Sequence, residues 1–303
     1  MSDAMCRDYA EITDLRASDP KAIARAWQAR TTRPTVRGNG RLMIVAADHP
    51  ARGALGVGAR PTAMNSRTDL LDRLRAALAD PGVDGALATA DILDDLLLLG
   101  ALDDKVVFSS MNRGGLAGAR FELDDRMTAA TAQATAAAGM NGGKMLCRID
   151  LDDPGTVGTL EACARAVDEL ASHGLIAMLE PFMSTRIDGK VGNDLSPDAV
   201  IKSVHISQGL GSTSAYTWMK LPVVDEMDRV MESTTMPTLL LGGDPADPDE
   251  AFASWEKALG LTSVRGLIVG RTLLYPPDDD VSSAVATAVS MVRTGASAAT
   301  GRG

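Results

Sequence analysis

Aromatic residues are scarce in this sequence, and cysteine and histidine are scarcer still. Phe, Trp and Tyr make up 3% of the 303 residues although 45% are hydrophobic, so a core has to be built from Ala, Val, Leu, Ile and Met. Such aliphatic side chains suit parallel strands that are covered by helices. The three cysteines are odd in number and irregularly spaced, which argues against a disulfide framework.

Long apolar runs and an excess of positive charge are also missing. The longest apolar burst, 96–99, is far shorter than the roughly 18 residues of a membrane helix, and the N-terminus lacks the basic and apolar segments of a signal peptide. The formal net charge of −10 argues against a nucleic-acid or anionic membrane surface. We therefore expect a cytoplasmic protein without nucleic-acid or membrane partners, in which an anionic ligand needs a local cationic pocket.

Short apolar runs alternate with longer Ala-rich stretches along the chain, a pattern typical of repeated βα units and a parallel sheet. Eight runs are predicted as strands: 42–47, 85–89, 106–110, 144–149, 175–180, 216–221, 238–242 and 266–270. The predicted helices are 67–79, 91–99, 124–138, 156–172, 197–208, 224–232, 249–259 and 281–294.

Eight such units favour a closed α/β barrel, the (β/α)₈ or TIM barrel, over a doubly wound sheet. The residues after the first run, Asp48-His49-Pro50-Ala51-Arg52-Gly53, do not fit the GxGxxG turn of a dinucleotide-binding fold. We predict an N-terminal helical extension over 1–40, a barrel over 41–295 and a flexible tail over 296–303. A helix over 20–30, capped by Asp19, is expected to form a lid across the barrel floor or an oligomer contact, and we expect a homo-oligomer.

Lys144, Glu180 and Lys220 are charged residues that stand out in mostly apolar strands. Active sites of such barrels lie at the carboxyl ends of the strands, where side chains from consecutive strands converge. Burial or a nearby cation gives a lysine the neutral amine that attacks a carbonyl. We predict Lys220 as the nucleophile, Glu180 as a proton shuttle and Lys144 as the group that keeps Lys220 neutral; a structural ion pair of Lys144 and Glu180 is the alternative.

Glycines end the last two predicted strands, and Arg271 follows the eighth. Backbone N–H groups at this place in barrels commonly bind phosphate, so we predict a phosphate or substrate site that comprises Gly242, Gly243, Gly270 and Arg271. Arg113, beside a glycine-rich loop after the third strand, is a candidate for binding a carboxylate, and His49 follows the first strand.

Metal binding is poorly supported by the sequence. Of the three histidines only His49 falls at a catalytic strand end, whereas His173 and His205 do not, which excludes a three-histidine zinc site. A Mg²⁺ site that uses Asp48 and Asp150 stays open. We predict no metal and no cofactor.

The segment 215–244 (AYTWMKLPVVDEM…MPTLLLGGD) resembles the corresponding part of class I aldolases, in which a lysine forms a Schiff base with the substrate. The similarity is to the deoxyribose-phosphate, tagatose-bisphosphate and archaeal-type fructose-bisphosphate aldolases. Further similarities lie in Ala46-Ala47-Asp48-His49 and in 266–273 (GLIVGRTL). The resemblance implies that Lys220 is the Schiff-base lysine, that Asp48 contacts substrate, and that Lys144 and Glu180 are catalytic.

The chain as a whole most resembles an actinobacterial group of (β/α)₈ proteins that accompany inositol-catabolism genes. That resemblance implies a phosphorylated keto-sugar or keto-sugar acid as substrate, in particular 2-deoxy-5-keto-gluconate 6-phosphate. Two alternatives remain: a metal-dependent lyase or isomerase that uses Asp48 and Glu180, and a non-catalytic barrel that binds sugar phosphates.

Overall fold

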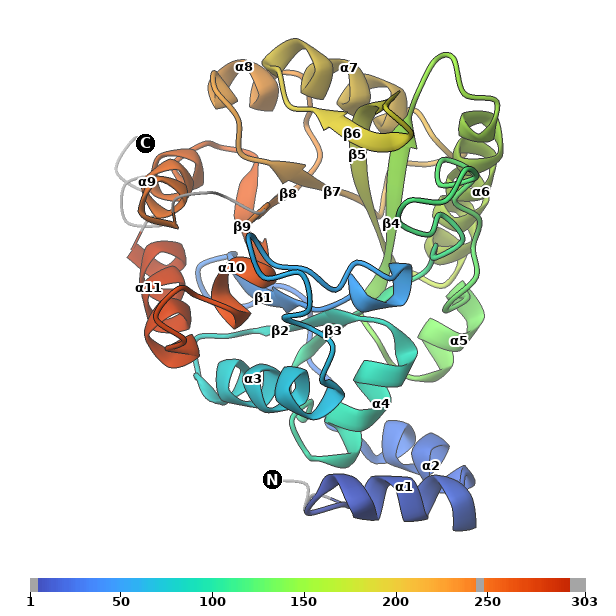
Figure 1. Ribbon diagram of the computed structural model, residues 1–303, viewed down its shortest axis with the longest axis vertical. Coiled ribbons are helices and arrows are strands. Elements are labelled where there is room, and N and C mark those ends of the chain that lie inside the picture. The colour runs from blue at the N-terminus through green and yellow to red at the C-terminus, as the bar shows by residue number, and fades with distance from the viewer. Residues whose placement is uncertain (1–4, 244–247, 295–303) are drawn as a thin grey trace.

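Eight parallel strands close into a barrel in the computed structural model, which describes residues 5–243 and 248–294 (Figure 1). These strands are β1 (Leu42–Ala46), β2 (Gly85–Ala88), β3 (Val106–Ser110), β4 (Gly142–Ile149), β5 (Ile176–Ile187), β7 (Thr217–Pro222), β8 (Thr238–Leu241) and β9 (Val264–Val269). They pair in chain order, and β9 pairs back with β1. The prediction of a (β/α)₈ barrel is confirmed.

Helices surround the barrel and connect its strands (Figure 1). They are α3 (Arg67–Ala79), α4 (Ala90–Leu98), α5 (Ala132–Ala137), α6 (Gly155–Ser172), α7 (Pro197–Gln208), α8 (Met227–Glu232), α9 (Pro248–Leu259), α10 (Arg271–Leu274) and α11 (Val281–Thr294), with a 3₁₀ turn η1 (Pro50–Arg52) after β1. Helix starts follow capping rules: Oγ of Ser66 accepts from the backbone N of Asp69, and Pro197 follows the cap Ser196.

Alternate residues of each strand point into the barrel, which is apolar in its lower part. This part is an apolar plug in the barrel interior, against which Trp218 also packs; it comprises Leu42, Ile44, Ala46, Leu87, Val106, Phe108, Ile176, Met178, Leu239 and Ile268. Further along the same strands, towards their carboxyl ends, the inward positions become polar. The barrel is therefore filled with apolar side chains below and carries its polar groups at one end.

Two helices precede the barrel, α1 (Tyr9–Ser18) and α2 (Lys21–Ala29). They pack on the outer side of α4 and not across the barrel floor (Figure 1). The predicted lid is therefore wrong, and the alternative of an oligomer contact stays a prediction. Nε1 of Trp27 donates to Asp94 at 2.7 Å, and Arg16 pairs with Asp95 at 2.6 Å. The apolar burst at 96–99 is explained by this cover, since Leu98 and Leu99 face α1.

The predicted cap of that extension is wrong. Pro20 is the N-cap of α2, it makes no side-chain hydrogen bond, and Asp19 instead ends α1. The chain then passes beneath the strands, where Arg30 donates to the carbonyls of Leu102, Lys105 and Gly139. The floor is thus crossed by an extended segment and not by a helix. The predicted tail lies outside the described residues.

The predicted helix over 124–138 is reduced to the short α5. Its first half is an irregular segment held by buried polar contacts: the backbone N of Asp125 donates to Thr159 at 2.8 Å, and Asn112 and Met127 form an isolated bridge. Helix α5 begins only where Thr131 caps it. Tertiary hydrogen bonds therefore override the helical preference of this Ala-rich stretch.

A β-hairpin was not predicted. Strand β5 continues to Ile187 and pairs in antiparallel fashion with β6 (Lys190–Asp194). The two turn residues, Asp188 and Gly189, have φ values of 50° and 80°, as a two-residue hairpin turn of this kind requires. The hairpin reaches the open end of the barrel, where Asn193 lines the cavity described below.

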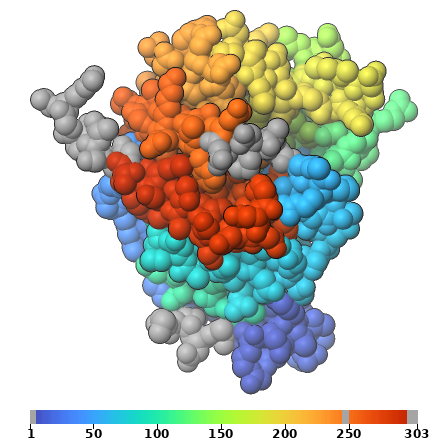
Figure 2. All heavy atoms as spheres, turned by 60° about the vertical axis from the view of Figure 1, so that its left-hand side comes forward, coloured from blue at the N-terminus to red at the C-terminus, as the bar shows by residue number. Residues whose placement is uncertain are grey.

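Figure 2 shows the side of the molecule on which α9, α11 and α3 lie next to one another, with α1 and α2 projecting at the lower end. None of the helices in the described ranges is both long and apolar enough to span a membrane.

Candidate active site

A cavity of about 710 Å³ opens at the carboxyl ends of the barrel strands. Six of the charged described residues that line it are cationic and three are acidic: Arg52, Arg113, Lys144, Arg148, Lys220 and Arg271 against Asp48, Glu180 and Glu250. A chain with a formal net charge of −10 therefore has a cationic pocket. A pocket of this size and sign suits a small anionic ligand.

Two lysines share one carboxylate inside this cavity. Nζ of Lys220 on β7 lies 2.8 Å from Oε1 of Glu180 on the neighbouring β5. The other oxygen of Glu180, Oε2, forms an ion pair with Lys144 on β4. All three side chains are buried and come from consecutive strands of the barrel. The structure thus brings together the three residues that the sequence singles out.

Asp48 extends this chain of charges towards β3. Its Oδ2 lies 3.2 Å from Nζ of Lys144, accepts a hydrogen bond from Ser110 at 3.0 Å and pairs with Arg113. Nε of Arg113 also donates to Oγ of Ser110 at 2.9 Å. Arg113 therefore lines the cavity while its guanidinium is engaged by Asp48 and Ser110, and burial lowers its pKa to about 10.

Burial and shared charge perturb the lysines and the glutamate. Burial lowers the pKa of Lys144 well below its ordinary value, Glu180 opposes this, and Lys220 adds to it. Burial likewise lowers the pKa of Lys220, again opposed by Glu180. Burial raises the pKa of Glu180, but its two lysine partners outweigh burial and hold this pKa well below its ordinary value. Glu180 is thus a carboxylate that two amines share.

His49 lines the same cavity beyond β1. Its Nδ1 is buried, has no hydrogen-bond partner in the part of the chain that the structure describes, and lies 3.9 Å from Oδ1 of Asp48. Burial lowers its pKa well below the ordinary value, and the cations Arg271 and Lys220 lower it further. The imidazole is therefore neutral near pH 7 and offers one donor and one acceptor to a ligand.

The predicted phosphate-binding residues Gly242, Gly243, Gly270 and Arg271 lie at the β8–β9 side of the cavity. A Cβ on Gly270 would lie 2.3 Å from the carbonyl oxygen of Ala46, and one on Gly242 would lie 2.4 Å from a methyl of Val269. These two glycines are required for packing between strands. Gly243 has a φ of 64°, and no atom of the described residues would lie within 4 Å of an added Cβ, so its backbone conformation is what calls for glycine.

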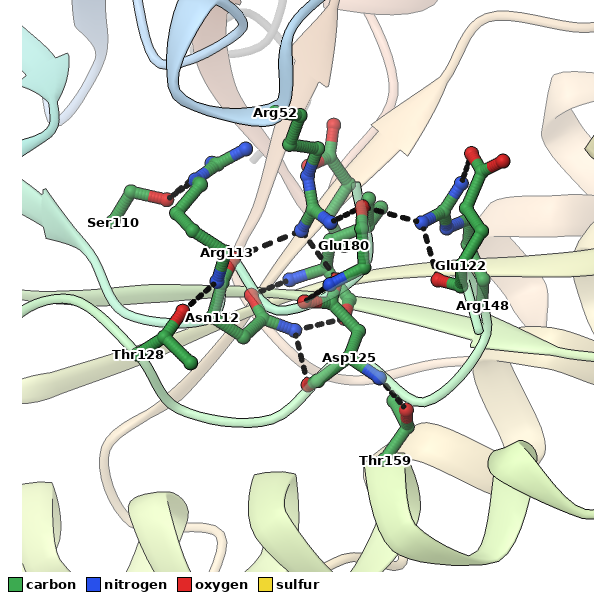
Figure 3. Close-up of polar contacts among 12 residues, drawn as sticks. Arg52, Ser110, Asn112, Arg113, Glu122, Asp125, Thr128, Arg148, Thr159 and Glu180 are labelled. Carbon is green, nitrogen blue, oxygen red and sulfur yellow. Dashed lines mark hydrogen bonds and ion pairs between the residues drawn. The ribbon is translucent and has the colours of Figure 1, made fainter. Parts of the chain in front are cut away.

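Two arginines of the cavity wall, Arg52 and Arg148, were not among the predicted site residues. Both are buried (Figure 3). Arg52, from η1, pairs with Asp125 and donates to the carbonyls of Asn112 (2.9 Å) and Gly115 (2.8 Å). Arg148, at the end of β4, binds Glu122 at 2.6 Å. A signal for Arg148 existed, because it lies four residues after Lys144 and so on the same face of the strand.

The loop after β3, which its glycines suggest to be flexible, is fastened by these contacts. The backbone N of Gly115 donates to Asp125 at 3.0 Å, and the backbone N of Ala117 donates to the carbonyl of Arg52 at 2.9 Å. The loops after β1 and β3 are therefore joined into one wall of the cavity.

Asp150, considered with Asp48 as a Mg²⁺ ligand, is not among the residues that line the cavity. Within ranges 5–243 and 248–294 there is no group of three His, Cys, Asp or Glu side chains that could hold a metal ion.

Comparison with solved structures shows that this fold is also the fold of Schiff-base aldolases. An archaeal fructose-1,6-bisphosphate aldolase, solved with its catalytic lysine bound to the carbinolamine intermediate, matches with a TM-score of 0.65 at 16% identity over 89% of this chain and 99% of that chain. A fructose-bisphosphate aldolase from Slackia heliotrinireducens matches with a TM-score of 0.59 at 13% identity over 94% and 92%. At these identities the similarity concerns the fold alone.

The particular family is given by a stronger match. The Cgl0159-like family profile matches residues 40–289. The crystal structure of Cgl0159 from Corynebacterium glutamicum matches with 58% identity and a TM-score of 0.92 over 94% of this chain and 96% of that chain. The chain belongs to the Cgl0159-like family. No protein of curated function matches it.

Proposed function

We propose that this protein is a cytoplasmic class I aldolase that cleaves or forms a carbon–carbon bond in a phosphorylated keto-sugar or keto-sugar acid. The observation that carries the proposal is the buried Lys220, whose Nζ lies 2.8 Å from Glu180 in a cationic cavity at the carboxyl ends of the strands. The shared aldolase fold supports it, because this is the end of the barrel at which catalytic residues lie.

Lys220 is the amine that we expect to be neutral. Burial lowers the pKa of Lys144 further than that of Lys220, yet the two amines and Glu180 hold their protons jointly. Lys144 contacts two carboxylates, Asp48 and Glu180, whereas among the described residues Lys220 forms an ion pair with Glu180 only. The proton therefore stays on Lys144, and Lys220 keeps a lone pair for attack.

In the proposed reaction Nζ of Lys220 adds to the substrate ketone, and loss of water gives an iminium. A hydroxyl on the carbon two bonds away loses its proton to Glu180, directly or through water. The bond between that carbon and the carbon next to the iminium breaks, and the electron pair of this bond forms the enamine. The carbon that carried the hydroxyl leaves as an aldehyde. Protonation of the enamine and hydrolysis of the iminium release the second product and restore Lys220.

The remaining residues position the substrate in this proposal. Lys144 hydrogen-bonds a substrate oxygen, and Asp48 orients a hydroxyl through Oδ1, since its contacts with Lys144, Ser110 and Arg113 all fall on Oδ2. Gly243 and Arg271 hold the phosphate. The resemblance to proteins that accompany inositol-catabolism genes favours 2-deoxy-5-keto-gluconate 6-phosphate, whose cleavage gives dihydroxyacetone phosphate and malonate semialdehyde.

The test is reductive trapping. Dihydroxyacetone phosphate with borohydride should leave a covalent adduct on Lys220 and none on Lys105, a half-buried lysine whose pKa is also lowered by burial but which lies before β3 at the opposite end of the barrel. An unmodified Lys220, with turnover that survives Lys220→Ala, would contradict the proposal. Activity should persist in EDTA, whereas a metal-dependent lyase would lose it. Binding of keto-sugar phosphates without turnover would indicate a non-catalytic barrel.

A further inference from the structure

Arg52 and Arg148 have no part in the proposed reaction, although both line the cavity. Each is about 7% exposed, and a buried guanidinium is costly unless its charge and its donors are satisfied. Ion pairs with Asp125 and Glu122 satisfy their charges but not all of their donors, so their placement in the cavity wall calls for an explanation beyond loop packing.

The two guanidinium groups converge on one carbonyl oxygen. Nη1 of Arg52 lies 2.8 Å and Nη2 of Arg148 lies 3.4 Å from the oxygen of Gly115. A Cβ added to Gly115 would lie about equally close to both, at 3.1 Å and 3.0 Å. The guanidinium groups of Arg52 and Arg148, two like charges, thus lie side by side at the loop after β3 (Figure 3).

Both arginines also keep an unused donor. Nε of Arg52 and Nε of Arg148 are buried and have no hydrogen-bond partner among the described residues. A buried donor that makes no hydrogen bond costs free energy, and an oxygen ligand that accepts from it would remove that cost. Paired guanidinium groups with spare donors are a favoured arrangement for oxyanions.

The position of this pair in the barrel defines what it can reach. Arg148 lies near the end of β4, and Arg271 follows β9. Strand β9 is four strands away and therefore on the opposite side of an eight-stranded barrel. Lys220 is on β7, two strands from each. A linear ligand with its ketone at Lys220 and its phosphate near Arg271 has its other end directed towards Arg148 and Arg52.

We propose that Arg148 and Arg52 form a second anion site, which binds a carboxylate at the end of the substrate opposite the phosphate. The substrate is then a linear keto-sugar acid phosphate and not a simple ketose phosphate. This assignment rests on the proposed function and deepens it, because the aldolase reaction alone requires only the ketone and the lysine.

A carboxylate fits this site better than a second phosphate. Arg52 already pairs with Asp125 and Arg148 with Glu122, so the cluster carries little net charge. A single negative charge adds less repulsion from those two carboxylates than the nearly two charges of a phosphate.

The test uses three linear ligands without a ketone, so that binding does not depend on a Schiff base. They are 6-phosphogluconate, sorbitol 6-phosphate and sorbitol 1,6-bisphosphate, measured by titration calorimetry. The wild-type protein should bind 6-phosphogluconate about 10- to 100-fold more tightly than sorbitol 6-phosphate, the range expected for hydrogen bonds to a charged group. The bisphosphate should bind less tightly than 6-phosphogluconate.

The matched variant removes both charges of one ion pair at once. Arg148→Gln/Glu122→Gln keeps side chains that can hydrogen-bond each other and should lose the preference for the carboxylate. Arg148→Lys, which keeps a cation beside Glu122, is the second variant if the first fails to fold, and should lose part of the preference. Arg186→Gln is the control: Arg186 fastens the same loop through the carbonyls of Ala119 and Arg120 but does not line the cavity.

Equal affinity for the three ligands, or a preference that survives in the double variant, would overturn the second site. Tighter binding of the bisphosphate that is lost in the variant would overturn its assignment to a carboxylate. If the protein discriminates among these ligands but is never trapped by borohydride, the second site stands and the proposed aldolase reaction is wrong. Trapping without discrimination overturns the site alone.

Discussion

The cavity holds two clusters of buried cations that are neutralised in different ways. Lys144 and Lys220 share the single carboxylate of Glu180, with Asp48 as a further partner of Lys144. Arg52 and Arg148 each have a carboxylate of their own, Asp125 and Glu122. Both clusters are buried, so the difference lies in how protons and charges are distributed and not in exposure to water.

This difference separates two tasks. A shared carboxylate leaves a proton that can move between neighbours, and the side chains involved are lysines, whose pKa shifts readily on burial. Arginines remain charged and offer a planar set of donors, so individually paired arginines fasten loops and hold shape. The lysine cluster is thus suited to chemistry and the arginine cluster to architecture and recognition. The following experiments test that division.

The largest effect is expected when the shared carboxylate is removed. In Glu180→Gln the proposed proton acceptor is lost, and kcat should fall by about 10²- to 10⁴-fold. Because Glu180 raises the pKa of both lysines, its removal should also shift the pH dependence of borohydride trapping on Lys220 to lower pH. Glu250→Gln, which changes an exposed acid in the same cavity wall, should alter neither value. Wild-type kcat in Glu180→Gln would contradict the catalytic assignment.

Removing one arginine of the other cluster should cost stability. Arg52→Met leaves Asp125 buried without its cation, and we expect the free energy of unfolding to fall by about 3–5 kcal/mol. Urea denaturation measures this change. The double variant Arg52→Met/Asp125→Asn should be more stable than the single variant, because no unpaired charge remains. If Arg52→Met alone is as stable as the wild type, the arginine cluster does not fasten the loops.

A smaller and more specific effect is expected from Lys144→Met. Loss of this cation removes its repulsion on the protonated Lys220, and Lys220 no longer shares Glu180 with a second lysine. Both changes raise the pKa of Lys220. We expect the apparent pKa for Schiff-base formation to rise by about one unit and kcat to fall, without unfolding of the barrel. A pH–rate profile that overlays the wild type would make Lys144 a structural ion-pair partner.

The lysine cluster was predictable from sequence because its residues are anomalies in a regular pattern. Lys144, Glu180 and Lys220 interrupt apolar strands, and the period of two places them inside the barrel. All eight barrel strands were predictable for the same reason. The hairpin of β5 and β6 also has a local sequence signal, the Asp188-Gly189 turn. It was not predicted because the eight βα units are complete without it: the hairpin only lengthens β5, a strand that the pattern already includes.

The arginine cluster was not predictable in the same way. Arg52 lies in the short 3₁₀ turn η1, and its partners Gly115 and Asp125 are more than 60 residues away. A single sequence carries no mark of such a pairing. The same contacts explain why the predicted helix over 124–138 is mostly absent, since Asp125 is needed in an extended loop where it can reach Arg52 and the backbone N of Gly115.

The smallest effect is expected for an arginine that fastens the same loop without a close carboxylate. Arg186 donates to the carbonyls of Ala119 and Arg120, its side chain is 26% exposed, and its nearest acid, Asp153, lies 3.8 Å away. Arg186→Gln leaves no buried carboxylate without its cation, so the free energy of unfolding should fall by at most about 1 kcal/mol. Urea denaturation beside Arg52→Met measures the contrast. Equal losses in the two variants would mean that loop contacts, and not the buried ion pair with Asp125, account for the stability that Arg52 provides.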